Sequence, residues 1–210
     1  MEDLSLYMAK SKDLSPLKGM TALKRLSLYA VPAEDLAPIT GATELTYLWL
    51  YMTHFKDHSA LAGMTKMQEL DCAMSSFVKL DVIESMPDLQ ILNLWDCRIE
   101  DWKSLAKAKN LKNLKLDGTS FSDLSLLSGC SKLERLHMEK CPIKDFTPVK
   151  DLASLEYLSI ERIDGIKDLS PFVAVPKLKY LYLSKDQVPA EAIENFKQQC
   201  PGVNVQVASY

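Results

Sequence analysis

The sequence lacks the features that direct a chain to a membrane or to a nucleic acid. No run approaches the ~18 consecutive apolar residues that a membrane-spanning helix needs. The acidic start, Met1 to Leu4, has neither the basic segment nor the apolar stretch of a signal peptide. The net charge is −3, so no basic excess favours nucleic acid or an anionic membrane as a partner. We therefore expect a cytoplasmic chain without such partners.

Cysteine is scarce and odd in number. The five cysteines among 210 residues cannot form a fully paired disulfide framework. Apolar residues make up 47% of the chain and charged residues 25%, a balance that supports a packed core rather than disorder. Residues 1–210 are predicted to form a single domain.

A period of 22 residues organises the chain. Counted from Leu23, apolar residues recur at positions 1, 4 and 6 of nine units, with one step of 23 between Leu155 and Leu178. All 27 slots are apolar, which a 47% background would produce by chance about once in 10⁹ trials. The repeat is therefore real. Position 4 holds Leu4, Leu26, Leu48, Leu70, Leu92, Leu114, Leu136, Leu158 and Leu181.

Apolar residues at positions 4 and 6, between variable residues at 3, 5 and 7, predict a short strand with one buried face. One such strand cannot bury that face alone, but stacked units form a continuous core and a parallel sheet. We expect an α/β solenoid with a sheet of about ten short strands. The repeat thus predicts the fold by itself.

The second half of each unit carries a helix-start signal. Seven units have aspartate at position 13, and in four of them proline follows three residues later. Such a carboxylate is predicted to cap one helical or 3₁₀ turn, with the proline tolerated in that first turn. A calcium ladder is the disfavoured alternative, because no second column of ligands accompanies the aspartates. They are Asp13, Asp35, Asp57, Asp101, Asp123, Asp145 and Asp168.

With these leucines, aspartates and prolines, nearly the whole chain resembles the leucine-rich repeat family, in particular its 22-residue internalin-like subclass. The resemblance implies a right-handed β/α superhelix with a curved parallel sheet and short helices on the convex side. It also implies a bacterial, non-enzymatic module that binds a protein on its concave face and needs no cofactor.

The two ends of the chain differ. Residues 184–210 are predicted to close the solenoid, with a helix at 189–200 that turns Ala192, Ile193 and Phe196 inward, followed by an alternating strand. The first strand has no comparable polar cover. We expect its edge to be covered by a preceding segment of a longer protein or by self-association with another chain.

The cysteines and histidines are interpreted as structural. All five cysteines are predicted to be buried thiols, which favours a reducing compartment. His54 and His58 lie four residues apart in a loop rather than on a helix, so no metal site is expected there. His137 is predicted to be a solvated neighbour of Lys115 and Glu139 on the sheet face. No motif couples a nucleophile, a base and an oxyanion site, so enzyme activity is not expected.

Tyrosine and tryptophan concentrate at positions 3, 5 and 7, the exposed side of the strands. Nine of the eleven Tyr and Trp residues fall there, six of them in the first five units, and none of the six Phe residues does. Strand preference alone predicts an even spread, so we favour a protein-binding patch. The predicted partner-binding aromatics are Tyr7, Tyr29, Tyr47, Trp49, Tyr51, Trp95, Tyr157, Tyr180 and Tyr182.

An acidic column completes the predicted site. Asp117, Glu139 and Glu161 occupy position 7 in three adjacent units. Either nearby Lys and Arg residues neutralise them, or a partner brings its own basic residues. We therefore expect a partner with an apolar element flanked by basic residues. Two roles stay open: a bacterial cytosolic adaptor or inhibitor of the immunity-protein type, or the recognition segment of a larger secreted or surface internalin-like virulence protein.

Overall fold

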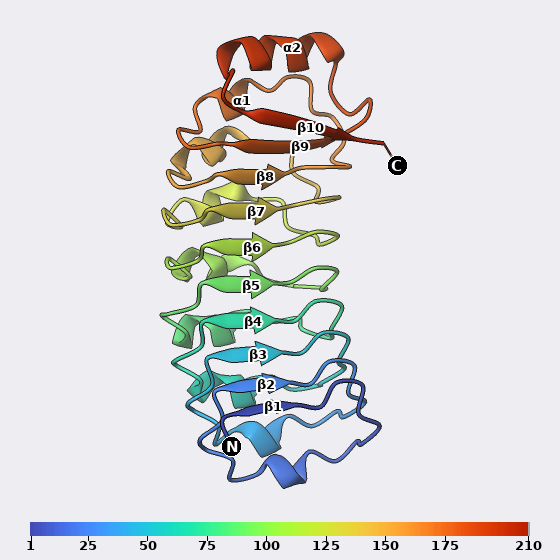
Figure 1. Cartoon of the computed structure of the whole chain (residues 1–210), viewed down its shortest axis with the longest axis vertical. Coiled ribbons are helices and arrows are strands. Elements are labelled where there is room, and N and C mark those ends of the chain that lie inside the picture. Colours follow the sequence, from blue (N-terminus) through green and yellow to red (C-terminus); the bar gives the residue numbers. More distant parts are fainter. Residues whose placement is uncertain (210) are drawn as a thin grey trace.

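The computed structural model describes residues 1–209 and places the strands in one open parallel sheet (Figure 1). Strand order follows chain order, so each strand pairs with the strands of the neighbouring units. The prediction of about ten strands is confirmed. They are β1 (Asp3–Ser5), β2 (Arg25–Ser27), β3 (Tyr47–Trp49), β4 (Glu69–Asp71), β5 (Ile91–Asn93), β6 (Asn113–Lys115), β7 (Arg135–His137), β8 (Tyr157–Ser159), β9 (Tyr180–Ser184) and β10 (Asn204–Ala208).

Each unit returns behind the sheet through a short helix (Figure 1). Across residues 1–209, no helix has the length and apolar character needed to cross a membrane. The 3₁₀ helices are η1 (Ser15–Leu17), η2 (Ala37–Ile39), η3 (Ser59–Gly63), η4 (Asp81–Ser85), η5 (Lys103–Lys107), η6 (Leu124–Leu127) and η7 (Thr147–Asp151), and the α-helices are α1 (Ser170–Val173) and α2 (Ala190–Gln199).

The repeat length sets the register of the sheet. Leu48 pairs with Leu26 on one side and with Leu70 on the other, and this position-4 pairing continues to β9. From Leu23 to Leu183, every residue at positions 1, 4 and 6 is buried. Removing apolar surface from water contributes about 25 cal/mol per Å², so this leucine column is the main source of stability. The predicted core is confirmed in these units.

The first unit is less well covered. Met1, which follows the repeat pattern, is 78% exposed, and Leu4 and Leu6 are half-buried. The cause is that no unit packs against the outer side of β1. A groove of about 290 Å³ lies at this end, lined by apolar residues that include Leu4, Leu6, Leu17 and Met20.

The position-13 aspartates cap the helices as predicted. In all seven units, the carboxylate accepts a hydrogen bond from the backbone N–H two residues later, at 2.8–3.0 Å. Six of these helices begin two residues after the aspartate, and only Asp123 stands directly at the helix start. These bonds satisfy N–H groups that have no partner within the helix.

Four of the five cysteines lie in the core, as predicted. Cys72, Cys97, Cys130 and Cys141 are buried free thiols. Burial raises the pKa of Cys97, Cys130 and Cys141 to about 11 each. The thiols of Cys97 and Cys141 donate to backbone carbonyls inside the turn, at 2.9 and 3.1 Å. The prediction for Cys200 was wrong: it is only half-buried, because it follows α2 at the end of the stack.

The last unit has the helix and strand that the sequence predicts. α2 lies across the end of the stack (Figure 1), with Phe196 buried and Ala192 and Ile193 half-buried against the core. β10 pairs in parallel with β9 over five residues. Val207 is 45% exposed, so the alternation of β10 weakens toward its end.

The caps generate a stability prediction. The backbone N–H of Thr147, and then its hydroxyl, lower the pKa of the Asp145 carboxyl below its ordinary value. We expect Asp145→Ala to lower the melting temperature at neutral pH. Because the folded pKa is lowered, this contribution is present above the unfolded pKa of ~3.9 and is lost as pH falls through the folded value. The two melting temperatures should therefore converge in acid.

Asp151→Ala is the matched control, because Asp151 is exposed at the last position of η7. Calorimetry or circular dichroism at several pH values measures both variants. Equal melting temperatures for Asp145→Ala and the unmodified chain at neutral pH would contradict the capping role.

Candidate partner-binding surface

The outward side of the strands carries the predicted aromatic residues. Strand alternation turns positions 3, 5 and 7 away from the core, and all nine predicted Tyr and Trp side chains are half-buried or exposed there. Tyr7, Trp95 and Tyr180 are the most exposed, at 61%, 42% and 43%. The core takes the phenylalanines instead, as Phe55, Phe77 and others show. The predicted segregation of aromatic types is therefore present in the structure.

Tyrosines at position 7 stack on one another. The ring centroids of Tyr7 and Tyr29 are 4.6 Å apart, and those of Tyr29 and Tyr51 are 4.7 Å apart. Trp95 continues the row with its centroid 6.2 Å from that of Tyr51, across the small side chain of Ala73. Strand spacing of ~4.8 Å matches the thickness of stacked rings. We call Tyr7, Tyr29, Tyr51 and Trp95 the tyrosine ladder.

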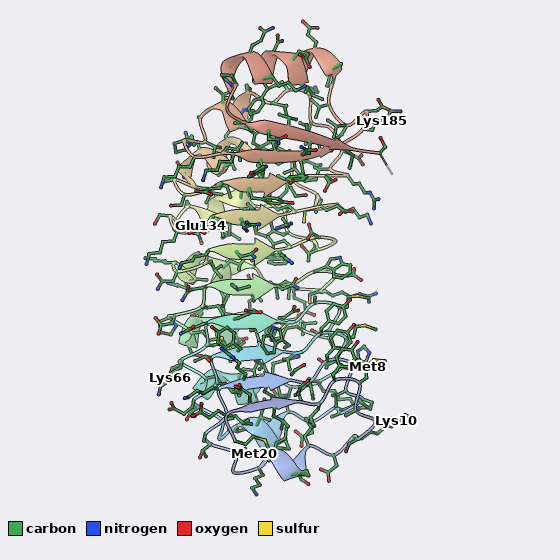
Figure 2. The ribbon with its side chains drawn as sticks, viewed as in Figure 1. Met8, Lys10, Met20, Lys66, Glu134 and Lys185 are labelled. Atoms are coloured by element: carbon green, nitrogen blue, oxygen red, sulfur yellow. The ribbon has the colours of Figure 1, made fainter. Side chains whose placement is uncertain are left out.

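Methionines accompany the ladder, and the sequence analysis missed them. Position 8 has a positive φ in the first eight units, with 52° at Met8, 55° at Met52 and 53° at Met74. The turn thus carries these side chains beside the ladder at the ends of the strands, where Met8 is visible in Figure 2. Met8 and Met52 are 60% and 42% exposed, and Met74 accepts a hydrogen bond from the Tyr51 hydroxyl at 3.2 Å. Three methionines in one column were the available signal.

Trp49 and Tyr47 lie beside the ladder on β3. The Trp49 indole N–H donates to Glu69 at 2.7 Å, and the ring centroids of Trp49 and Tyr47 are 6.0 Å apart. The Arg25 guanidinium sits 4.9 Å from the Tyr47 ring centroid, within cation–π range. Trp49 is thus held in one orientation before any partner arrives, which lowers the entropy lost on binding.

The remaining aromatics form a second cluster at β7, β8 and β9. Tyr157 is its centre: its ring centroid lies 4.6 Å from that of Tyr182, 6.5 Å from that of Tyr180 and 4.7 Å from the His137 ring. Arg135 sits 5.5 Å from the same ring. Burial, followed by the neighbouring Tyr182, raises the pKa of Tyr157 to about 12.

The prediction of a solvated His137 was wrong. Its ring is half-buried against Tyr157, with Lys115 next to it in register on β6. Desolvation, and then the charges of Lys115 and Arg135, lower the pKa of His137 to about 4. The ring is therefore neutral at physiological pH.

The acidic column is partly neutralised within the chain. Glu139 pairs with Arg162 at 3.0 Å and lies 3.8 Å from Lys140. Asp117 accepts the backbone N–H of Glu139 at 2.7 Å, and burial raises its pKa. Glu161 accepts a hydrogen bond from the Ser159 hydroxyl. Of the basic residues expected to neutralise the column, Arg162 does so, whereas Arg135 stacks on Tyr157 instead.

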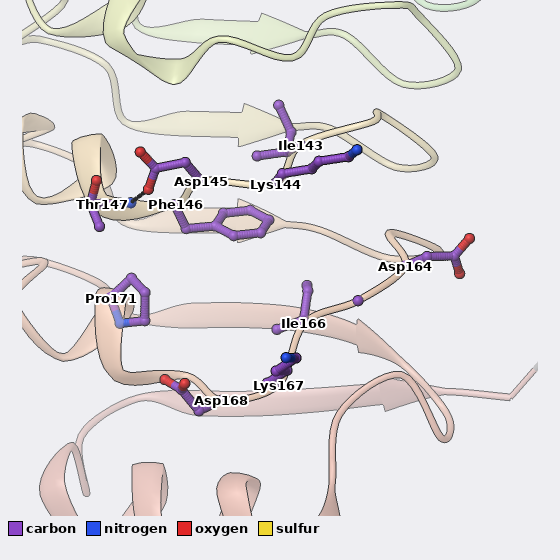
Figure 3. Close-up of a pocket in the computed structure, with 11 residues that line it drawn as sticks. Ile143, Lys144, Asp145, Phe146, Thr147, Asp164, Ile166, Lys167, Asp168 and Pro171 are labelled. Atoms are coloured by element: carbon purple, nitrogen blue, oxygen red, sulfur yellow. Dashed lines mark hydrogen bonds between the residues drawn. The ribbon is translucent and has the colours of Figure 1, made fainter.

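An unpredicted cavity opens away from the sheet face, between the seventh and eighth units (Figure 3). It measures about 490 Å³ and lies where the 23-residue step adds one residue near Gly165, whose φ is +82°. Ile143, Phe146 and Ile166 are among its apolar lining residues. The nearby Asp145 and Asp168 carboxylates cap helices.

No group of three or more histidine, cysteine or acidic side chains suited to a metal ion occurs in the part of the chain that the structure describes. His54 contacts the Ser76 hydroxyl at 3.2 Å, and His58 packs edge-on against Phe77. Both rings therefore make contacts of a structural kind.

Comparison with protein-family models and with curated proteins gave no match. Among solved structures, the chain is similar to an internalin (inlF) from Listeria monocytogenes, with a TM-score of 0.88 and 26% identity over 100% of this chain and 63% of that one. Internalin C2 (inlC2) from the same species gives 0.81 and 26%, over 86% and 80%. A leucine-rich-repeat (LRR) protein from Leptospira interrogans gives 0.79 and 15%, over 98% and 60%.

The chain is a leucine-rich-repeat protein. It is internalin-like in fold and spans 63% of the length of the internalin inlF. The assignment of this LRR chain to the 22-residue subclass stays a prediction, as does the role of the partner-binding residues.

His137 gives the LRR sheet a predicted acid sensitivity. Because its folded pKa is lowered to about 4, the unfolded chain binds a proton at higher pH than the folded chain does. Stability is then full above the unfolded value of ~6.5 and is lost as pH falls toward 4. At pH 5 we expect a loss of about 2 kcal/mol from this ring, which denaturant unfolding would measure.

His137→Gln should reduce that loss, and His54→Gln, in an exposed loop, should leave it in place. Burial also lowers the pKa of His58, so a smaller acid effect remains in both variants. An identical pH profile for His137→Gln and the unmodified chain would show that the ring is not desolvated.

Proposed function

We propose that this leucine-rich-repeat chain is a non-enzymatic module that binds a partner protein on its sheet face, the predicted concave surface. The observation that carries the proposal is the tyrosine ladder, a continuous aromatic surface on a protein whose phenylalanines lie in the core. Exposed Tyr and Trp residues combine large contact area with few rotatable bonds, and such residues dominate binding energies at protein interfaces.

The charges around these aromatics support a partner with basic residues. Glu69 and Asp71 lie on β4, beside Trp49, and Asp96 follows Trp95 directly. Asp117 and Glu139 extend the acidic character toward the second aromatic cluster. Opposite charges on a partner would speed association and fix its orientation more than they add affinity. The partner is therefore an apolar element flanked by lysine or arginine.

The polar groups on the sheet face support binding rather than catalysis. His137, the one histidine on the strands, is held neutral and stacked on Tyr157. Ser159 is buried and donates to Glu161. A nucleophile needs a hydrogen-bonded base within reach of substrate, and these two side chains serve other contacts.

Within this class, a bacterial cytosolic adaptor or an inhibitor of the immunity-protein type is the favoured role. The free thiols of the described cysteines support a reducing compartment. The likeness to Listeria internalins supports a bacterial origin, and it favours one other role. Because the chain spans only 63% of inlF, it is alternatively the recognition segment of a larger secreted or surface protein.

The aromatic surface is tested with a triple variant. Trp49→Ala, Tyr51→Ala and Trp95→Ala together should abolish capture of the partner from a lysate of the source cells, and Trp49→Ala or Tyr51→Ala alone should cost about 2 kcal/mol or more of binding free energy. Calorimetry with the purified partner measures the single variants.

Lys107→Ala with Lys150→Ala is the control, because both lysines are exposed on the helical side. This variant should capture the partner as the unmodified chain does. Undiminished capture by a correctly folded triple variant would refute binding through the sheet face.

A further inference from the structure

An apolar ridge runs along the ends of the first five strands. It consists of the tyrosine ladder together with Met8, Met52 and Met74, and we call it the ladder ridge. Four of the seven large apolar side chains that are exposed in residues 1–209 belong to it: Tyr7, Met8, Met52 and Trp95. The ridge lies beside the sheet face, so the proposed function leaves its methionines unexplained.

The turn geometry does not account for the methionines. Position 8 adopts a left-handed backbone in unit after unit, a conformation that favours Gly, Asn or Asp. Gly118 and Asp96 occupy two of these positions, but Met8, Met52 and Met74 occupy three others. Methionine therefore brings a side chain rather than a backbone preference. Its flexible, polarizable thioether suits a surface that adapts to an apolar partner.

The charges beside the ridge are unequal at its two ends. Near Trp95 lie Asp71, Asp96 and Asp117, and none of these three forms a salt bridge with another described residue. Asp71 accepts from the Asn93 amide and the Ala73 N–H, and Lys115 is the nearest cation to Asp117. The other end, near Met8, carries the exposed Lys10 and Lys12. A partner with basic residues at one end fits this arrangement.

The length of the ridge sets the size of the partner element. From the first to the fifth strand, four spacings of ~4.8 Å give about 19 Å, the length of an α-helix of about 13 residues. One turn of such a helix rises ~5.4 Å, close to one strand spacing. Successive apolar side chains on one helix face would thus each meet one unit of the ridge.

We propose that the ladder ridge binds a basic amphipathic α-helix of the partner protein. This helix is about 13 residues long, places its apolar face on the rings and methionines, and directs Lys or Arg at one end toward Asp71, Asp96 and Asp117. The inference rests on the proposed function and specifies the binding element of the partner. Helices of this kind dock into apolar surfaces through residues spaced i, i+3, i+4 and i+7.

Random 16-residue peptides displayed on phage are the probe, panned against the full chain. We expect enrichment of sequences with apolar residues at helical spacing and with Lys or Arg toward one end. Enrichment of acidic peptides, of proline-rich peptides, or of no sequence at all would overturn the inference. Synthetic copies of enriched peptides are then titrated by fluorescence anisotropy.

The decisive variant changes only the methionines. Met8→Asn with Met52→Asn removes two exposed apolar side chains and installs a residue that accepts a positive φ, so the melting temperature should be unchanged or higher. We expect peptide affinity to fall about 30-fold or more, as for interface anchors. Unchanged affinity in this folded variant would refute the ridge as the docking surface.

A second variant separates the two proposals. Trp49→Ala with Tyr157→Ala alters the sheet face and leaves the ladder ridge intact. If peptide binding responds to this variant and not to the methionine variant, binding through the sheet face stands and the ridge inference fails. The Lys107→Ala, Lys150→Ala control should bind the peptides as the unmodified chain does.

Discussion

The whole structure depends on one constraint: a three-residue strand cannot bury its apolar side unless another strand lies against it. Parallel pairing with a 22-residue register solves this for every unit except the first, since each leucine meets the equivalent leucine of its neighbours. The same register stacks every other position of the repeat. Capping aspartates and exposed tyrosines form columns for the same reason that the leucines do.

This column-forming rule explains why much of the molecule was predictable from the sequence. Period and apolarity identified the strands and the core, and Asp13 and its six equivalents cap helices as their position suggested. The segregation of Tyr and Trp from Phe placed nine rings on the outward side. These features all depend on the position within the repeat, and position is written in the sequence.

Other features depend on neighbours in space, and these the sequence did not reveal. His137 is desolvated because Tyr157 lies beside it on the next strand, and Cys200 is half-exposed because the stack ends there. The cavity near Gly165 follows from one added residue, whose effect on the surface needs the path of the backbone. The methionines of position 8 were legible as a column, but their place beside the ladder depends on a left-handed turn.

The unequal coverage of the two ends also affects how the chain opens. Every contact in the stack is between neighbouring units, so cooperativity is short-ranged and unfolding starts where one neighbour is absent. In this chain that place is β1, whose Leu4 and Leu6 are half-buried, whereas α2 covers the opposite end. Tyr7 and Met8 therefore belong to the segment that frays first, and an occupant spanning several rungs would tie this loose end to the interior.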